Sequence, residues 1–215
     1  MLRVKAVDVS IQSVSILRNV SLEVPTGEFV GLIGRNGAGK TTLMRTVMGL
    51  LPLRSGGIEL DGKPLAHTPT HLRARGGIGY MPEDRRLVPD LTVAENVLIP
   101  AWSAGVKDPA PRLAAIYRMI PEVEQFSDRK ALQLSGGQQK LVALARALMC
   151  GTRLLLLDEP FEGVAPVLAR RLAEVIAKLK LQGLSIVLTE SDLSHSKEML
   201  DRVYTIDRGE VSPAR

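Results

Sequence analysis

The sequence contains a single cysteine, Cys150, and this scarcity excludes a disulfide framework. Cys150 ends an apolar stretch and precedes Gly151, a position typical of a buried thiol in a protein of the reducing cytosol. Long apolar runs are also missing, because no stretch approaches the ~20 residues needed to span a bilayer. The opening residues Met1–Lys5 start no signal peptide. We therefore expect a cytoplasmic protein, and any work at a membrane would require other chains to supply the spans.

Aromatic residues make up only 3% of the chain, too few for the base-stacking platforms of single-strand nucleic-acid binders. The formal net charge of +5 and the pI of about 9.6 are mildly basic. Basic residues are scattered, with small clusters such as Arg85/Arg86 and Arg170/Arg171. We interpret these basic residues as part of a solvated surface and expect no nucleic-acid partner.

The length of 215 residues suits one α/β domain with a small inserted subdomain and is too short for tandem nucleotidase domains. Alternating apolar and polar residues over 2–11, 20–24 and 58–60 predict half-exposed antiparallel strands. Continuous apolar runs over 29–33, 154–157 and 184–188 are typical of strands buried on both faces of a parallel sheet. Each of these runs leads into a polar loop and a helix. The pattern predicts a mainly parallel core sheet flanked by helices, with an antiparallel β subdomain.

Four prolines, at 100, 109, 111 and 121, interrupt the segment between Asn96 and Leu134, whose strongest helical pattern covers Arg112–Met119. We expect a small helical subdomain over about 96–134. The catalytic core would then cover about 1–95 and 135–215, within one domain of residues 1–215.

A phosphate-binding loop of the G-x-x-x-x-G-K-[ST] type lies between the apolar strand 29–33 and a helix predicted from Lys40 to Met48. The backbone N–H groups of this loop and the helix dipole can converge on a nucleoside triphosphate. Lys40 adds a point charge for the outer phosphates, and the Thr41 hydroxyl is the expected Mg²⁺ ligand. A Gly-rich turn without a ligand is the alternative interpretation. The candidate binding residues here are Gly34, Asn36, Gly37, Ala38, Gly39, Lys40, Thr41 and Thr42.

Two adjacent carboxylates, Asp158 and Glu159, follow the apolar run 154–157, where a buried strand reaches the ligand-binding edge of an α/β sheet. Asp158 suits the Mg²⁺ shell. Glu159 can orient or deprotonate the water that attacks the γ-phosphate. An acidic helix start is the alternative, and it explains one carboxylate better than two.

The stretch Ser135-Gly136-Gly137-Gln138 precedes a helix predicted over Gln139–Met149. Ser135 and Gln138 have capping-box spacing, which is a purely structural explanation. Capping alone does not require two glycines, whereas glycines let backbone N–H groups approach an anion at a helix N-terminus. We predict that these four residues bind phosphate as well as cap the helix.

With these motifs in this order, nearly the whole chain resembles the nucleotide-binding subunit of ATP-binding cassette (ABC) transporters. The resemblance implies a P-loop NTPase fold of ABC type, an ATPase coupled to transmembrane transport, and ATP and Mg²⁺ as cofactors. It also implies a head-to-tail homo- or heterodimer in which Ser135 and Gly137 of one subunit cover ATP held by Lys40 of the other. Expected partners are integral membrane permease subunits and a periplasmic or extracellular substrate-binding protein. The chain would then lie on the inner face of the membrane.

The resemblance places Tyr80-Met81-Pro82-Glu83 at the Q-loop, with Glu83 where glutamine is commoner, so Glu83 becomes a candidate catalytic and metal-binding residue. Ala165 stands in the D-loop where aspartate is common. Both variants, and the stretch 91–96, are similar to the branched-chain amino acid (Liv-type) import branch. This favours amino-acid import. Export of a lipid or another substrate, and a soluble role without a membrane partner, are the alternatives. The segment from Glu83 to Trp102 is the expected contact with the permease.

Two positions depart from the family pattern. Ser191 stands where the family has a switch histidine after the last core strand; serine can hydrogen-bond phosphate but cannot carry the charge of histidine. His195 lies nearby, and we interpret it as an ordinary polar residue. Counting back from Val20-Ser21-Leu22 places Ile11 where an aromatic usually stacks on adenine, so apolar contact would replace π-stacking.

Overall fold

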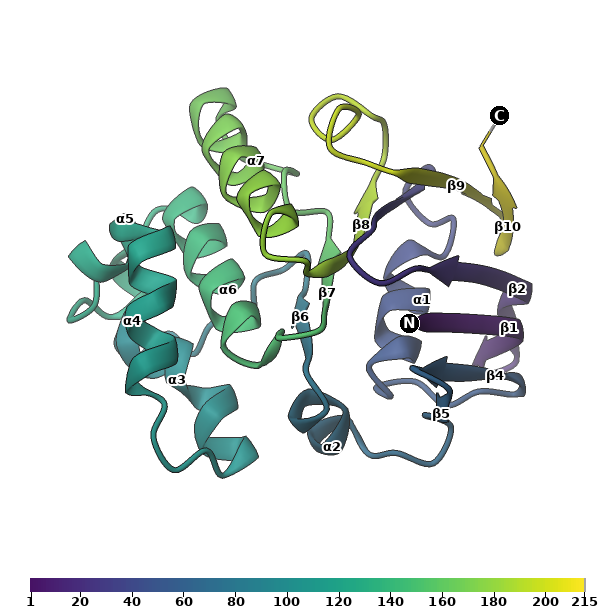
Figure 1. Cartoon of the computed structure of the whole chain (residues 1–215). Helices are drawn as coiled ribbons and strands as arrows, with labels where there is room; N and C mark the ends of the chain where they lie inside the picture. The colour runs from purple at the N-terminus through teal and green to yellow at the C-terminus, as the bar shows by residue number, and fades with distance from the viewer. Residues whose placement is uncertain (215) are drawn as a thin grey trace.

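The computed structural model describes residues 1–214, which form two β-sheets and a group of helices (Figure 1). The strands are β1 (Leu2–Ile11), β2 (Val14–Val24), β3 (Phe29–Ile33), β4 (Ser55–Leu60), β5 (Lys63–Pro64), β6 (Ile78–Met81), β7 (Leu154–Asp158), β8 (Ser185–Glu190), β9 (Arg202–Asp207) and β10 (Glu210–Pro213). The helices are α1 (Lys40–Val47), α2 (Thr70–Arg75), α3 (Val93–Ala104), α4 (Ala110–Met119), α5 (Pro121–Gln125), the 3₁₀ turn η1 (Ala131–Gln133), α6 (Gly136–Cys150) and α7 (Pro166–Lys180).

The larger sheet has six strands in the order β10-β9-β3-β8-β7-β6. All neighbouring pairs from β9 to β6 are parallel, and β10 adds an antiparallel edge. Strands β3, β7 and β8 are buried along nearly their whole length, as their continuous apolar runs predict. Because the parallel strands share one direction, β3, β7 and β8 end at the same edge. The phosphate loop follows β3 at this edge, and Asp158 ends β7 there.

The smaller sheet is antiparallel, in the order β2-β1-β4-β5. Its strands alternate buried and exposed residues, which confirms the antiparallel β subdomain. Register shifts interrupt the pairing of β1 with β2 at several points. These irregularities bend the hairpin, and it packs beside α1 and the edge of the larger sheet (Figure 1).

The proline-interrupted segment folds into α3, α4 and α5, which pack against α6 on the side away from the antiparallel sheet (Figure 1). Helix α3 begins at Val93 because Thr92 and Glu95 form a capping box that starts it there, ahead of the expected boundary at 96. Pro100 is accommodated inside α3. The division of the chain at residues 96 and 134 stays a prediction.

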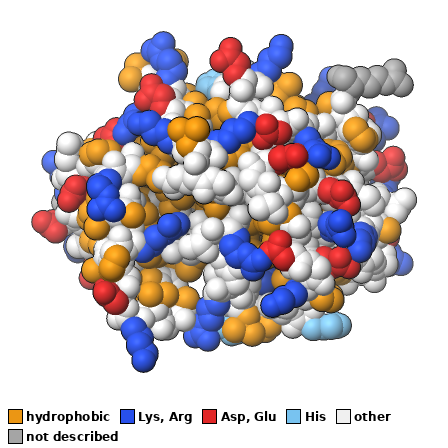
Figure 2. Space-filling model, in the orientation of Figure 1, with side chains coloured by type: hydrophobic (Ala, Val, Ile, Leu, Met, Phe, Trp, Pro, Cys, Tyr) orange, Lys and Arg blue, Asp and Glu red, His pale blue; other side chains and the backbone are white. Residues whose placement is uncertain are grey.

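Two hydrophobic cores lie on opposite faces of the larger sheet. Strand β7 contributes to both, because Leu155 and Leu157 belong to the core with α6 and α7, whereas Leu154 and Leu156 belong to the core with α1 and the antiparallel sheet. The surface in Figure 2 carries interspersed cationic and anionic side chains. Within residues 1–214 we find no helix with the length and apolar character required to cross a bilayer.

Candidate functional site

The phosphate loop joins β3 to α1 and lines a cavity of about 430 Å³. Gly37 and Gly39 adopt left-handed backbone with φ of 82° and 115°, which favours glycine. At Gly34 a Cβ atom would lie 2.2 Å from the Ile206 carbonyl oxygen, so the chain passes too closely for a side chain. The cavity is lined by Ile16, Asn36, Gly37, Gly39, Lys40, Thr41, Thr42, Glu83 and Glu159.

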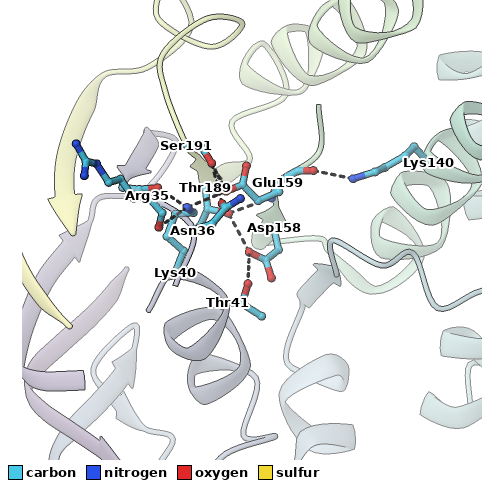
Figure 3. Close-up of polar contacts among 10 residues, drawn as sticks. Arg35, Asn36, Lys40, Thr41, Lys140, Asp158, Glu159, Thr189 and Ser191 are labelled. Carbon is cyan, nitrogen blue, oxygen red and sulfur yellow. Dashed lines mark hydrogen bonds and ion pairs between the residues drawn. The ribbon is translucent and has the colours of Figure 1, made fainter. Parts of the chain in front are cut away.

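Lys40 is only 5% exposed and its ammonium points back along the loop (Figure 3). It donates to the carbonyl oxygens of Gly34 and Arg35, the latter at 3.1 Å. Its Nζ atom also lies 2.9 Å from Glu159 Oε1. A buried ammonium is tolerated because acceptors surround it. The loop lysine and the second carboxylate after β7 are therefore in direct contact.

Asp158 is fully buried and accepts hydrogen bonds from three hydroxyl groups, of which those of Thr41 and Thr189 are drawn in Figure 3. Thr41 and Thr189 donate to Oδ1 at 3.2 and 2.9 Å, and Tyr80 donates to Oδ2 at 3.3 Å. Burial raises the pKa of Asp158, and the hydrogen bonds from the three hydroxyls oppose that rise. Burial, followed by the charge of Asp158, raises the pKa of Tyr80, so that phenol stays protonated as a donor.

Thr41 lines the cavity, and its hydroxyl lies beside the carboxylate of Asp158, so two hard oxygen groups of the type that Mg²⁺ prefers lie next to each other. Across residues 1–214, no group of three or more His, Cys, Asp or Glu side chains could hold a metal ion. Magnesium usually binds one or two protein groups together with phosphate oxygens and water, and Thr41 and Asp158 supply a donor set of that kind.

Glu159 has a left-handed backbone with φ of 47°, a strained conformation for a residue with a side chain. Its N–H donates to Thr189 Oγ1 at 3.0 Å, and its carbonyl oxygen accepts from Lys140 Nζ at 2.7 Å. Its carboxylate accepts from Ser191 Oγ at 3.2 Å in addition to contacting Lys40. The N–H, the carbonyl oxygen and Oε1 of Glu159 all have partners, and these contacts direct Oε1 toward Lys40.

Glu83 follows β6 and lines the same cavity, although much of its side chain is exposed. Burial raises the pKa of Glu83, and the charges of Glu162, Asp158 and Glu159 raise it further. The chain beyond Glu83 is held on α6, since Arg146 donates to the carbonyl oxygens of Arg85 and Arg86.

The residues Ser135–Gln138 form the start of α6. Ser135 caps the helix and exchanges hydrogen bonds with Gln138 in a capping box. The helix therefore begins at Gly136 instead of the expected Gln139, and both glycines lie in its first turn. Gly137 also has a packing reason, because a Cβ atom there would lie 1.9 Å from Leu168 Cδ2. None of these four residues lines the Lys40 cavity of the same chain.

Ser191 lies beside the catalytic candidates, with its hydroxyl 3.0 Å from Asn36 Oδ1 and 3.2 Å from Glu159 Oε1. His195 is turned elsewhere and stacks on Phe161, with ring centroids 5.1 Å apart. Both Ser191 and His195 line a second cavity of about 340 Å³. Ser191, and not His195, makes the contacts with Asn36 and Glu159.

Ile11 lies opposite Val14 at the turn of the β1–β2 hairpin, is 39% exposed, and does not line the phosphate-loop cavity. Ile16 lines it instead. Contact of Ile11 with adenine stays a prediction. Other contributors missed from the sequence are Thr189, the hydroxyl of Tyr80, and Lys140. A polar residue at the end of a buried strand was the available signal for Thr189, and a lysine within an apolar helix was the signal for Lys140.

This fold and this arrangement of loop, lysine and paired carboxylates define a nucleotide-binding cassette of the P-loop class. The protein-family model described as "ABC transporter" matches residues 17–162, more than half of the chain. The chain belongs to the ABC transporter family as an ATP-binding subunit, and it is an ATPase. These findings confirm the fold class and the family that the motifs indicate.

Two curated relatives are similarly close to this chain. The branched-chain amino acid transport ATP-binding protein BraG of Pseudomonas aeruginosa is 35% identical over 91% of this chain and 84% of the relative. The lipopolysaccharide export ATP-binding protein LptB of Haemophilus influenzae is 34% identical over 94% of this chain and 85% of the relative.

Solved structures agree with this assignment. The dimeric structure of a bacterial ABC transporter cassette aligns with a TM-score of 0.89 and 27% identity, covering 100% of this chain and 99% of that chain. A dimeric post-hydrolysis cassette bound to ADP and Pi aligns with a TM-score of 0.88 and 26% identity, at the same coverage. Cassettes of this family bind ATP and ADP, dimerise, and work with membrane permease subunits.

Proposed function

We propose that this chain binds MgATP in the Lys40 cavity and hydrolyses it to drive an integral membrane permease. The proposal rests on the contact between the phosphate loop and the Asp158–Glu159 pair, two motifs that lie far apart in the sequence. Thr41 Oγ1 lies 3.2 Å from Asp158 Oδ1, and Lys40 Nζ lies 2.9 Å from Glu159 Oε1. Phosphoryl transfer depends mainly on positioning and on neutralising charge, and this arrangement supplies groups for both.

Each group has a distinct role in this proposal. The loop amides and Lys40 bind the triphosphate. Thr41 and Asp158 would hold Mg²⁺, which would supply positive charge to the phosphate oxygens, and Glu83 lines the same cavity as Thr41. Glu159 accepts a hydrogen bond from the attacking water and orients it toward the γ-phosphate. Ser191 donates a hydrogen bond to a phosphate oxygen, in place of the charge that a histidine would supply.

The proposal includes a head-to-tail dimer. The Ser135–Gln138 turn lies outside the Lys40 cavity of its own chain, so it is free to cover nucleotide held by a second cassette. The dimeric cassette that aligns over the whole chain supports this arrangement. Ser135→Arg, which adds a bulky side chain at that turn, is expected to prevent an ATP-dependent dimer.

Two variants test the nucleotide site. Lys40→Ala is expected to weaken MgATP binding at least ~100-fold because it removes the point charge at the outer phosphates. Lys178→Ala, at an exposed lysine on α7, is the matched control and should bind as the unmodified chain does. Calorimetry gives both affinities, and circular dichroism verifies folding. Unchanged affinity in folded Lys40→Ala protein would contradict the proposed site.

For the cargo, we propose import of branched-chain or other amino acids, with a periplasmic or extracellular substrate-binding protein as a further partner. The similarity to BraG and the Liv-type features at Glu83 and Ala165 support this choice. Lipid export is the second candidate, since LptB is 34% identical over 94% of this chain. Purification with the native membrane subunits, reconstitution into vesicles and uptake of radiolabelled leucine, isoleucine or valine test the first candidate. ATP-dependent extraction of lipopolysaccharide without amino-acid uptake would establish the second.

The permease would hold the chain on the cytoplasmic face of the membrane. The proposed contact lies along residues 83–102, where Val88 is 41% exposed and Trp102 is 52% exposed. Buried residues of the same segment, such as Val97, pack within the cassette and are not available for contact. We propose that a short amphipathic helix of the permease packs against these exposed apolar side chains. Crosslinking from cysteines introduced at Val88 and Trp102, with Cys150 replaced by Ala, should capture a cytoplasmic loop of the permease.

A further inference from the structure

Lys140 is a buried lysine, 3% exposed, in the second turn of α6. An ammonium group in such a position is costly unless it is paired. Its Nζ atom donates to the carbonyl oxygen of Glu159 at 2.7 Å (Figure 3). This contact joins α6 to the residue after β7. A lysine stem alone would pack in the helix interface, but the ammonium is directed at one particular peptide.

The peptide that Lys140 contacts is strained. Glu159 has φ of 47°, and its N–H is held from β8 by Thr189 Oγ1 at 3.0 Å. Lys140 holds the carbonyl side from α6. The two contacts together stabilise a backbone conformation that is unfavourable for a residue with a side chain. The same conformation directs the Glu159 carboxylate toward Lys40, 2.9 Å away.

Charge around Lys140 supports the same role. Burial lowers the pKa of Lys140, and Arg85 lowers it further, whereas Glu83, Glu162 and Glu159 raise it. The ammonium therefore lies among three carboxylates and one guanidinium. It offsets the mutual repulsion of Glu83 and Glu159 on the walls of the cavity.

Helix α6 begins at the Ser135 cap and runs without interruption to Cys150. A helix moves largely as a rigid body, so a displacement at its first turn also displaces Lys140. We infer that Lys140 is a positioning residue for hydrolysis: it fixes the peptide of Glu159 and links the helix that begins at Ser135 to the carboxylate beside Lys40. This inference rests on the proposed role of Glu159 in orienting water.

Four variants of the full chain test the inference. Lys140→Met keeps the apolar stem and removes the ammonium, and Lys140→Arg restores a cationic donor. Lys178→Met makes the same change at an exposed lysine of α7. Glu159→Gln reports on the proposed function itself. Single-turnover hydrolysis with protein in excess over radiolabelled ATP detects slow rates, while calorimetry gives MgATP affinity and thermal unfolding gives stability.

Lys140→Met is expected to hydrolyse ATP roughly 10-fold or more slowly, as small misplacements of positioning groups do, with MgATP affinity within about 3-fold of the unmodified chain. Lys140→Arg should recover most of the rate, and Lys178→Met should be unchanged. An unchanged rate in Lys140→Met overturns the inference. A parallel loss of rate, affinity and stability also overturns it, since that result describes a structural contact alone.

If Lys140→Met does not fold, Lys140→Leu takes its place under the same criteria, because it also keeps an apolar side chain and removes the donor. The Glu159→Gln variant separates the two claims. Slow hydrolysis in Glu159→Gln together with an unchanged Lys140 variant rejects the inference and leaves the proposed function in place. A normal rate in Glu159→Gln rejects the role of Glu159 and the inference with it.

Discussion

Lys40 Nζ lies 2.9 Å from Glu159 Oε1, with both side chains almost fully buried, at 5% and 6% exposure. The charge that is proposed to bind phosphate and the charge that is proposed to orient water thus neutralise each other in the protein. A triphosphate in the loop gives Lys40 a second anionic partner and lets the Glu159 carboxylate turn toward water. We therefore expect Glu159 to influence both nucleotide binding and hydrolysis.

The first prediction concerns the charge at Glu159. Glu159→Gln keeps the shape of the side chain and removes its charge, so ATP hydrolysis should slow at least ~100-fold, the range for losing a general base. MgATP affinity should be equal or tighter, because Lys40 no longer has a carboxylate partner. Single-turnover kinetics and calorimetry measure the two effects. Size exclusion with MgATP should show an accumulated dimer, and a monomer under these conditions would contradict the head-to-tail arrangement for the isolated subunit.

A second prediction separates Ser191 from His195. Ser191 contacts Asn36 and Glu159, whereas His195 stacks on Phe161. Ser191→His places a group that can carry charge beside the phosphate site and should raise turnover several-fold. His195→Ala should change turnover less than about 2-fold, because the ring stacks on Phe161 and it is Ser191 that contacts Asn36 and Glu159. Steady-state ATPase assays decide this, and a collapse of turnover in His195→Ala would show that the two roles are reversed.

The third prediction is about stability at Gly79 on β6. A Cβ atom at Gly79 would lie 2.1 Å from the Ala147 carbonyl oxygen on α6, a backbone atom that cannot move alone. Gly79→Ala should cost about 2 kcal/mol by overpacking and lower the melting temperature by about 5 °C. Gly57→Ala is the matched control, since nothing lies within 4 Å of a Cβ there. Differential scanning calorimetry compares them, and equal melting temperatures would contradict the close approach of β6 and α6.

The fourth prediction follows from Glu190 at the end of β8. Burial raises the pKa of Glu190 from 4.5 to about 7, the charges of Asp192 and Glu159 add to the rise, and a hydrogen bond from Ser196 opposes it. Between these pH values the folded chain holds a proton that the unfolded chain has released. The contribution of Glu190 to the free energy of unfolding is therefore fully present below pH 4.5 and is lost as pH rises through 7.

Glu190→Gln removes this titration. We expect the unmodified chain to lose roughly 1 kcal/mol or more relative to Glu190→Gln between pH 5 and 8. That difference corresponds to about 3 °C in melting temperature. Parallel thermal melts across this pH range measure it. Identical pH slopes for the two proteins would show that Glu190 titrates normally.

Much of the fold was predictable because its strands carry local patterns. Continuous apolar runs identified β3, β7 and β8, and alternation identified β1. Helix starts were less accurate. A capping box at Ser135 starts α6 at Gly136, ahead of the expected Gln139, since side-chain hydrogen bonds decide the first turn.

The candidate site was predictable where one short motif contains it. The phosphate loop and the Asp158–Glu159 pair are both contiguous in sequence. Thr189 was missed because it reaches Asp158 only through the parallel register of β7 with β8, where Asp158 pairs with Thr189. Ile16 was missed because register shifts in the β1–β2 hairpin cannot be counted from sequence spacing.

Strand β7 separates the two hydrophobic cores that lie on opposite faces of the larger sheet. Its odd-numbered leucines, Leu155 and Leu157, face the layer with α6 and α7, and Leu154 and Leu156 face the layer that holds α1 and the hairpin. A change in the packing of one core would therefore tilt β7 while the other core stays packed. Asp158 ends β7 and Glu159 follows it, at the end of the strand where a small tilt would produce the largest displacement. We therefore expect a change in the packing of either core to displace both carboxylates.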